Sequence, residues 1–231
     1  MGAAKGNSNA KNDMTKDDAP WAEGGDAYWL DSLIYDSVAA GLTEADPTTT
    51  NWEESKTLLG SGKVASLVLA SWAIAQMQAA AVTAGGSADD IGFLPVPAAA
   101  AGPTYAVILS DRAFAINKQS KNKEAARAWV DWFINSGSYA ADQGFISAVK
   151  SAPLPASLAG LNTLGTKLIE VTPPAAGKEG LFDQIDSQSE IGFSAAGYRQ
   201  KLVDEARAGT PKADAFAELN TKWAAARAAI G

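Results

Sequence analysis

Trp72 is the residue whose type and position best suit the binding of a flat ligand. The short apolar run of residues 64–70 precedes it and predicts a buried strand, and Ser71 is a favourable N-cap for a helix that follows. Such a strand-to-helix corner lies where parallel strands open their binding crevice. An indole ring there could stack on a ligand, although a tryptophan at a helix start is about as often a core or rim aromatic.

The segment 60–63, Gly-Ser-Gly-Lys, suggests a second chemistry, the binding of phosphate. A phosphate loop needs glycine at position 57 and serine or threonine at position 64, where this sequence has Thr57 and Val64. Such a loop also joins a strand to a following helix, whereas here the Gly-Lys pair ends a predicted helix and precedes a predicted strand. The sequence therefore disfavours nucleotide binding.

Two missing residue types limit the possible catalysis. The sequence has 231 residues and contains no cysteine and no histidine. It therefore has no thiol nucleophile, no Ser-His-Asp triad, and no thiolate or imidazole ligand for a metal. Catalysis would have to rest on carboxylates, lysine or tyrosine. We predict that the protein is not an enzyme and has no metal site and no cofactor.

The charge and the hydropathy pattern limit the partners. The net charge of -7 disfavours nucleic acid and anionic membranes, which an acidic surface repels. No apolar run approaches the roughly 18 residues of a membrane-spanning helix. Residues 1–18 are rich in Gly, Asn, Lys and Asp and lack the apolar core of a secretion signal. We therefore predict a flexible polar leader over residues 1–19 and no signal segment in this sequence.

Helices and strands alternate in the remainder of the chain, which indicates an α/β protein. Periodicity and capping residues predict helices over residues 28–41, 52–60, 71–84, 122–134, 139–145, 192–208 and 211–229. Short apolar runs predict strands over residues 64–70, 91–96, 105–109 and 113–117. The region 153–174 is predicted to be mostly loop, apart from residues 161–171. No internal repeat is evident.

A series of short segments follows in a fixed order between about residues 26 and 150. It comprises Ala39-Ala40-Gly41-Leu42 at a helix end, Trp52 with Ser55-Lys56-Thr57-Leu58-Leu59, Gly62-Lys63-Val64-Ala65 leading to Ser71-Trp72, Ile91-Gly92-Phe93-Leu94-Pro95-Val96-Pro97, Ala115-Ile116-Asn117-Lys118, and Ser120-Lys121-Asn122-Lys123-Glu124-Ala125-Ala126. In order and spacing, this series resembles the carbohydrate-type solute-binding proteins of bacterial ABC importers, the group of maltose-binding protein. The two final helices agree with this resemblance.

The resemblance implies a fold of the type II periplasmic-binding-protein kind, in which two α/β lobes enclose a sugar. Residues 20–103 and 155–231 are similar to the C-terminal lobe of that fold. Residues 104–154 are similar to the crossing segment and the portion that returns to the N-terminal lobe. Most of the N-terminal lobe has no counterpart, so we expect the sequence to be a natural or engineered fragment.

The resemblance also implies a function, the capture of a sugar or oligosaccharide for an ABC importer. The implied ligand-binding residues are Trp72 with Ser71, Tyr105 with Asp111 on the crossing segment, and Phe193 with Tyr198 near the family's second aromatic contact. Asp111 could equally be a solvated turn residue. The implied partners are a carbohydrate, the permease subunits of the importer and the missing N-terminal lobe. The implied location is extracellular or periplasmic, with a membrane anchor in the full-length form.

The predicted helix over residues 122–134 carries an apolar stripe that includes Trp129 and Trp132, whose spacing is typical of packing residues. In the family this stripe packs on the N-terminal lobe, so we expect it to lie partly uncovered here.

Two other functions remain open. A carboxylate-dependent glycoside hydrolase would need two acids about 5 to 9.5 Å apart across a cleft, and the sequence contains many acids without a distinguishing pair. Alternatively, the chain could be an isolated half-domain with no ligand activity.

Overall fold

The structure is a computed structural model that describes residues 2–46, 49–97, 102–110 and 113–231. The chain folds into two compact units, and each is described here by itself. Unit 1 contains residues 1–49, 95–109 and 167–231, and unit 2 contains residues 50–94 and 110–166. The lobe boundaries expected from the resemblance refer to the longer fold of the family and stay a prediction.

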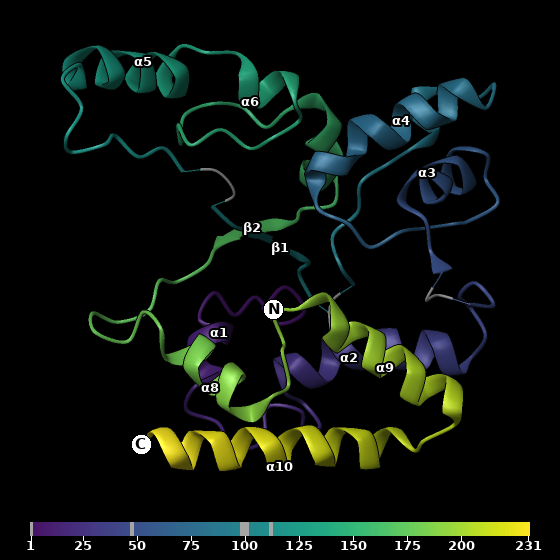
Figure 1. Cartoon of the computed structure of the whole chain (residues 1–231). Coiled ribbons are helices and arrows are strands. Elements are labelled where there is room, and N and C mark those ends of the chain that lie inside the picture. Colours follow the sequence, from purple (N-terminus) through teal and green to yellow (C-terminus); the bar gives the residue numbers. More distant parts are fainter. Residues whose placement is uncertain (1, 47–48, 98–101, 111–112) are drawn as a thin grey trace. The chain divides into compact units, whose positions relative to one another are not determined.

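Unit 1 is a group of helices with a small sheet. Its helices are α1 (Ala10–Met14), α2 (Asp26–Ala39), α8 (Leu181–Ser189), α9 (Ala196–Ala208) and α10 (Lys212–Ile230). Helix α10 contacts α8, α2 and α9, so the end of the chain closes the core of this unit (Figure 1). Gly209, in the left-handed conformation with φ 76°, ends α9, and Pro211 precedes α10. These residues explain why the two final helices could be predicted.

The core of unit 1 is aromatic. Trp21 and Trp223 are 1% and 0% exposed, and their rings meet edge to face with centroids 5.9 Å apart. Phe182 and Phe193 extend the same cluster, and Met14 of α1 is buried in it. Because α1 lies within residues 1–19, part of the expected polar leader is helical and packed. The sequence there is polar overall, and its few apolar residues suffice to dock α1.

The sheet of unit 1 has two strands, β1 (Tyr105–Ile108) and β2 (Lys167–Glu170). They are parallel, with Tyr105 opposite Lys167 and Ile108 opposite Glu170. The prediction of a strand beginning at Tyr105 is therefore confirmed. Strand β2 falls in the part of the region 153–174 that was expected to be ordered.

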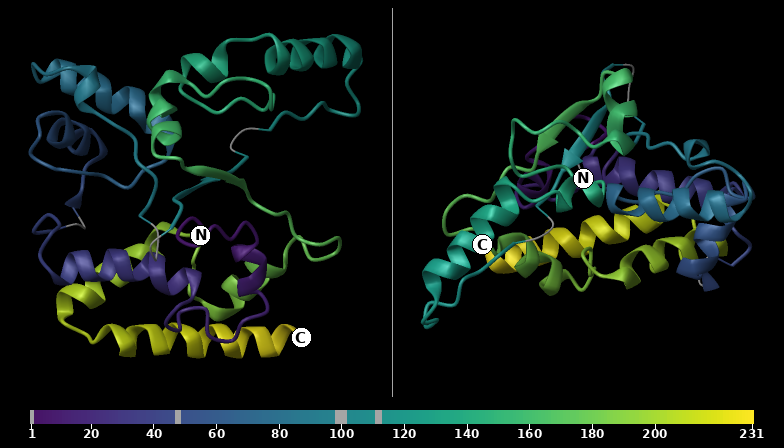
Figure 2. Two further views of the ribbon diagram at one scale, coloured as in Figure 1. Left: turned by 180° about the vertical axis from the view of Figure 1, so that it is seen from behind. Right: turned by 90° about the horizontal axis from the view of Figure 1, so that it is seen from above.

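Unit 2 is built from short helices and extended segments (Figure 2). Its helices are α3 (Trp52–Gly60), η2 (Ser71–Ala73), α4 (Ile74–Thr83), η3 (Ala88–Asp90), α5 (Lys123–Asn135), α6 (Tyr139–Asp142), η4 (Ala156–Leu158) and α7 (Ala159–Thr163). Helices α3 and α4 pack against each other. Among the described residues of both units, no helix is long and apolar enough to cross a membrane.

Three predicted strands are wrong. Residues 64–70, 91–96 and 113–117 are irregular in the structure. Their apolar side chains are largely exposed, as Val68 at 76% and Leu94 at 71% illustrate. A strand is stable only when a neighbouring strand satisfies its backbone hydrogen bonds, and none of these segments pairs with another described segment. Apolar composition alone therefore misled the prediction.

Gly60 allows α3 and α4 to approach closely. A Cβ atom at this position would lie 2.6 Å from the Ala80 carbonyl carbon and 2.7 Å from the Ala81 nitrogen. We expect Gly60→Ala to destabilise the α3–α4 pair by about 1–3 kcal/mol, because an added methyl group must push two backbones apart. Hydrogen exchange of the α3 and α4 amides measures the effect. Gly92→Ala is the matched control, since a Cβ at Gly92 meets nothing within 4 Å. Unchanged protection in Gly60→Ala would contradict this account of the packing.

Candidate functional site

Trp72 lies on the surface of unit 2, in the short helix η2 that leads into α4. Its side chain is 42% exposed, whereas the next two residues, Ala73 and Ile74, are buried. Ala73 and Ile74 hold η2 against the unit, and the indole ring of Trp72 stays at the surface. Ser71 beside it is partly buried. Trp72 is therefore a rim aromatic and not a core residue of this unit.

Trp52 is a second tryptophan in contact with Trp72. The two ring centroids are 5.6 Å apart and the ring planes are inclined by 49°. Trp52 is the first residue of α3, and the Asn51 side chain caps this helix by accepting hydrogen bonds from the amides of Glu53 and Glu54. The cap fixes the start of α3 and with it the backbone that carries Trp52.

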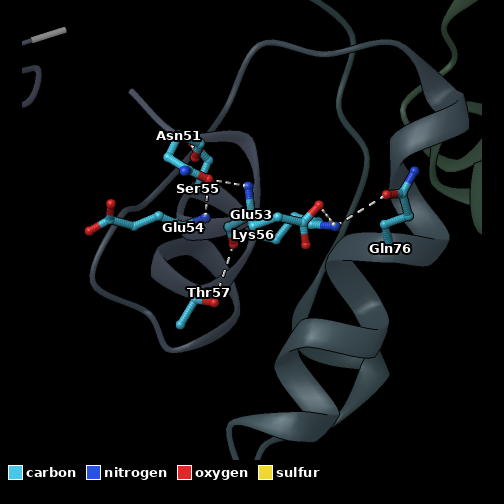
Figure 3. A network of polar contacts seen from close by, with 7 residues as sticks. All are labelled: Asn51, Glu53, Glu54, Ser55, Lys56, Thr57 and Gln76. Carbon is cyan, nitrogen blue, oxygen red and sulfur yellow. Dashed lines mark hydrogen bonds and ion pairs between the residues drawn. The ribbon is translucent and has the colours of Figure 1, made fainter. Parts of the chain in front are cut away.

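Lys56 connects Trp52 to polar groups, and Figure 3 shows its contacts with Glu53 and Gln76. Its Nζ lies 5.3 Å from the centroid of the Trp52 ring. The same atom contacts the Glu53 carboxylate at 2.7 Å and the Gln76 side-chain oxygen at 3.5 Å. Because Gln76 belongs to α4, Lys56 joins the two helices. An exposed indole with ammonium, carboxylate and amide groups nearby is suited to a neutral, hydroxyl-rich ligand.

Three of the other expected ligand-binding residues belong to unit 1. Tyr105 is a partly buried residue of β1 in unit 1, and its ring lies against the backbone of Gly6. Asp111 lies outside the described residues. Phe193 and Tyr198 belong to unit 1 and are 8% and 3% exposed. Of the five expected residues that the structure describes, unit 2 thus brings together Ser71 and Trp72.

Tyr198 is part of a buried hydrogen-bond network. Its hydroxyl donates to Asp31 Oδ2, which also accepts a hydrogen bond from Trp21 Nε1 at 2.7 Å. Burial raises the pKa of the Asp31 carboxyl above its usual value, and the hydrogen bonds from Tyr198 and Trp21 offset part of this rise. Burial, together with the charge of Asp31, also raises the pKa of Tyr198. The network joins α2, α9 and the Trp21 loop.

The second buried acid also has a structural role. Asp186 of α8 accepts a hydrogen bond from the Phe193 amide at 2.7 Å and one from the Ser194 amide at 3.3 Å. These bonds hold the loop between α8 and α9. The buried carboxylates Asp31 and Asp186 are therefore both occupied by neighbours of the same unit.

A shallow pocket in unit 1 is a weaker candidate for a ligand site. It lies between α9 and α10 and includes Lys201, Glu218 and Lys222 in its lining. Glu218 accepts from Lys222 at 2.7 Å and from Lys201 at 3.0 Å, which lowers the pKa of its carboxyl. These three charges satisfy one another, which makes them less available to a ligand.

The exposed stripe expected on the helix over residues 122–134 is confirmed. Trp129 and Trp132 of α5 are 50% and 57% exposed, and no residue of this helix is buried. Trp129 stacks on Phe133 with centroids 5.3 Å apart, and Phe114 meets both rings edge to face. Within this chain the two tryptophans are thus surface residues.

Sequence reasoning missed the aromatic partner of Trp72. Trp52 stood in one of the segments that carry the resemblance, but nothing in its spacing placed it beside a residue 20 positions away. Gly60 was the available signal, because a glycine that ends one helix shortly before another permits close helix packing.

Comparisons with known proteins identify a family and similar solved structures. The family model for bacterial extracellular solute-binding proteins matches residues 2–140. A manno-oligosaccharide-specific solute-binding protein from Bifidobacterium animalis subsp. lactis ATCC 27673, in complex with mannotriose, has a TM-score of 0.84 and 31% identity. A second binding protein of an ABC transporter from that organism, in complex with mannobiose, has a TM-score of 0.85 and 30% identity.

Each alignment covers 99% of this chain and 55% of the solved chain, so the sequence spans about half the length of these structures. No curated protein matches the chain.

Proposed function

The chain belongs to the family of bacterial extracellular solute-binding proteins, and on this premise we propose that it contributes to the binding of a manno-oligosaccharide for uptake by an ABC importer. The two similar structures hold mannobiose and mannotriose, which supports mannose-containing oligosaccharides as the ligand class.

The observation that carries the proposal is the exposed indole of Trp72. A pyranose ring presents a face of C–H groups that packs on an aromatic ring, and its hydroxyls need a few donors and acceptors at the edge. Trp72 supplies the ring, and Lys56 and Gln76 supply polar groups on the same pair of helices. Tyr105, Asp111, Phe193 and Tyr198 stay predictions from the resemblance.

The proposal includes a second lobe and the importer permease as partners. The exposed aromatic stripe of α5 supports the proposed contact with a second lobe, since apolar surfaces of this kind usually pack on another surface.

We further propose an extracellular or periplasmic location, with membrane anchoring in a longer form of the protein. We propose no catalytic role, because the similar structures are solute-binding proteins.

Titration of the chain with mannobiose and mannotriose, followed by NMR of the tryptophan indole N–H groups, tests the proposal. We expect a weak, saturable shift of the Trp72 signal, because unit 2 offers one aromatic surface and a full site needs more contacts. Trp72→Ala should weaken binding by about 1–3 kcal/mol.

Trp129→Ala is the matched control, since Trp129 is similarly exposed, at 50%, but lies on α5. A wild-type chain whose Trp72 signal stays unchanged at saturating oligosaccharide, or a Trp72→Ala variant that binds as well as the control, would contradict the proposal.

A further inference from the structure

The two tryptophans of unit 2 differ in what their rings can still contact. Trp72 is 42% exposed, whereas Trp52 is partly buried. The inclination of 49° between the rings also prevents both from stacking on one flat sugar ring. One ring must therefore be the contact surface, and the more exposed Trp72 is suited to that role.

Trp52 is already occupied on two sides. The Lys56 ammonium lies 5.3 Å from its ring centroid, within the range of a cation–π contact. Trp72 lies against it with a centroid separation of 5.6 Å. A ligand would have to displace one of these neighbours to stack on Trp52.

Lys56 is itself held in place. Its side chain is only 17% exposed, and its Nζ contacts Glu53 on α3 and Gln76 on α4 (Figure 3). Gln76 lies four residues after Trp72, on the helix that η2 leads into. The Lys56 ammonium over Trp52 is thus tied to the helix that follows Trp72, and the side chains of Trp72, Trp52, Lys56 and Gln76 form one connected group.

We propose that Trp52 is a positioning residue, which holds the Trp72 indole in the orientation that binds the sugar. This inference rests on the proposed function for the role of Trp72. A free surface tryptophan loses side-chain freedom when a ligand immobilises it, and this loss weakens binding. Contact with Trp52 removes that freedom before the ligand arrives, so Trp52 contributes to affinity without touching the sugar.

The first test needs no ligand. Two indoles 5.6 Å apart couple their electronic transitions, so we expect an exciton couplet in the circular dichroism spectrum. The contribution of this pair to the couplet should disappear in Trp52→Leu and in Trp72→Leu alike, while that of Trp21 and Trp223, whose ring centroids are 5.9 Å apart, should remain in both variants. The {1H}-15N NOE of the Trp72 indole should be high in the wild type and fall in Trp52→Leu. An unchanged NOE in Trp52→Leu would overturn the inference, whatever the chain binds.

The second test is affinity for mannotriose. We expect Trp52→Leu to bind roughly two- to tenfold more weakly than the wild type, as expected when an interfacial side chain must be ordered on binding. Trp52→Phe, which restores an aromatic contact with Trp72, should recover most of the loss. Lys56→Met should give a smaller loss, and Lys63→Met, at an exposed lysine outside this group, should give none.

The outcomes separate this inference from the proposed function. If the wild type binds no oligosaccharide, the proposed function fails, and the NOE still decides whether Trp52 restrains Trp72. If Trp72→Ala abolishes binding while Trp52→Leu binds like the wild type, the function stands and the inference is wrong. Amide spectra of Trp52→Leu show whether α3 stays folded; if it unfolds, Trp52→Phe and Lys56→Met decide the question through the same NOE and affinities.

Discussion

Trp223→Ala is expected to lower the free energy of unfolding of unit 1 by about 3–5 kcal/mol, which is enough to leave much of the unit unfolded. The side chain is 0% exposed and its ring contacts Trp21 and Phe182, with centroids 5.9 and 5.4 Å away. Its indole N–H also donates to the Met14 carbonyl oxygen at 3.1 Å. The substitution therefore removes a large packed ring and leaves the Met14 carbonyl without this bond.

Urea unfolding followed by circular dichroism measures the effect, and Trp132→Ala provides the control. This variant makes the same chemical change at a side chain that is 57% exposed, and we expect its free energy of unfolding to change by no more than about 0.5 kcal/mol. Equal midpoints for the two variants would show that α10 does not close the core of unit 1 as described.

The helices were predictable because their ends carry local signals. Asn51 caps α3, Gly209 ends α9 and Pro211 precedes α10, and each acts through contacts within a few residues. The α/β fold and the family were predictable for a different reason. The order of several short segments is specific even though each segment alone is common, and the match to solved structures confirms that resemblance.

The strands failed because strand formation depends on a partner elsewhere in the chain. Residues 64–70 and 105–108 have similar apolar composition, but only the second segment has a parallel neighbour, β2. No local pattern records which apolar run will find such a neighbour.

The buried side of α2 was also unpredictable from apolar spacing. The apolar residues at helical spacing here include Tyr28, Leu33 and Val38, yet the residues that the structure buries include Asp31 and Tyr35. Asp31 is buried because Trp21 and Tyr198, which are distant in sequence, supply donors to its carboxylate. A periodicity argument places a carboxylate on the surface, so it misses a core position of this kind.

The buried Asp31 carboxyl leads to a specific dependence of stability on pH. Its pKa in the folded state is raised above the usual value of 3.8, because the ionised form loses hydration in the core. Asp31 Oδ1 is buried and has no hydrogen-bond partner within the described residues, which adds to the penalty on the ionised form.

The sign of the effect follows from proton binding. Below pH 3.8 the carboxyl is protonated in both states, and its contribution to stability is fully present. Between pH 3.8 and the folded pKa, the unfolded chain has released the proton while the folded chain still holds it. The stability that this group contributes therefore falls across this interval, by at most about 1.4 kcal/mol per pH unit, and is constant above the folded pKa.

We therefore expect Asp31→Asn to remove this loss, because asparagine keeps the shape and an acceptor oxygen for Trp21 or Tyr198 without an ionisable group. The free energy of unfolding of Asp31→Asn, minus that of the wild type, should rise between pH 3.8 and neutrality. Urea titrations at several pH values measure this difference, and the subtraction cancels the acids that both proteins share. Asp131→Asn, which makes the same chemical change at an exposed position of α5, is the matched control. A flat difference for Asp31→Asn would mean that its carboxyl titrates at its usual pKa, and that Tyr198 and Trp21 fully compensate for its burial.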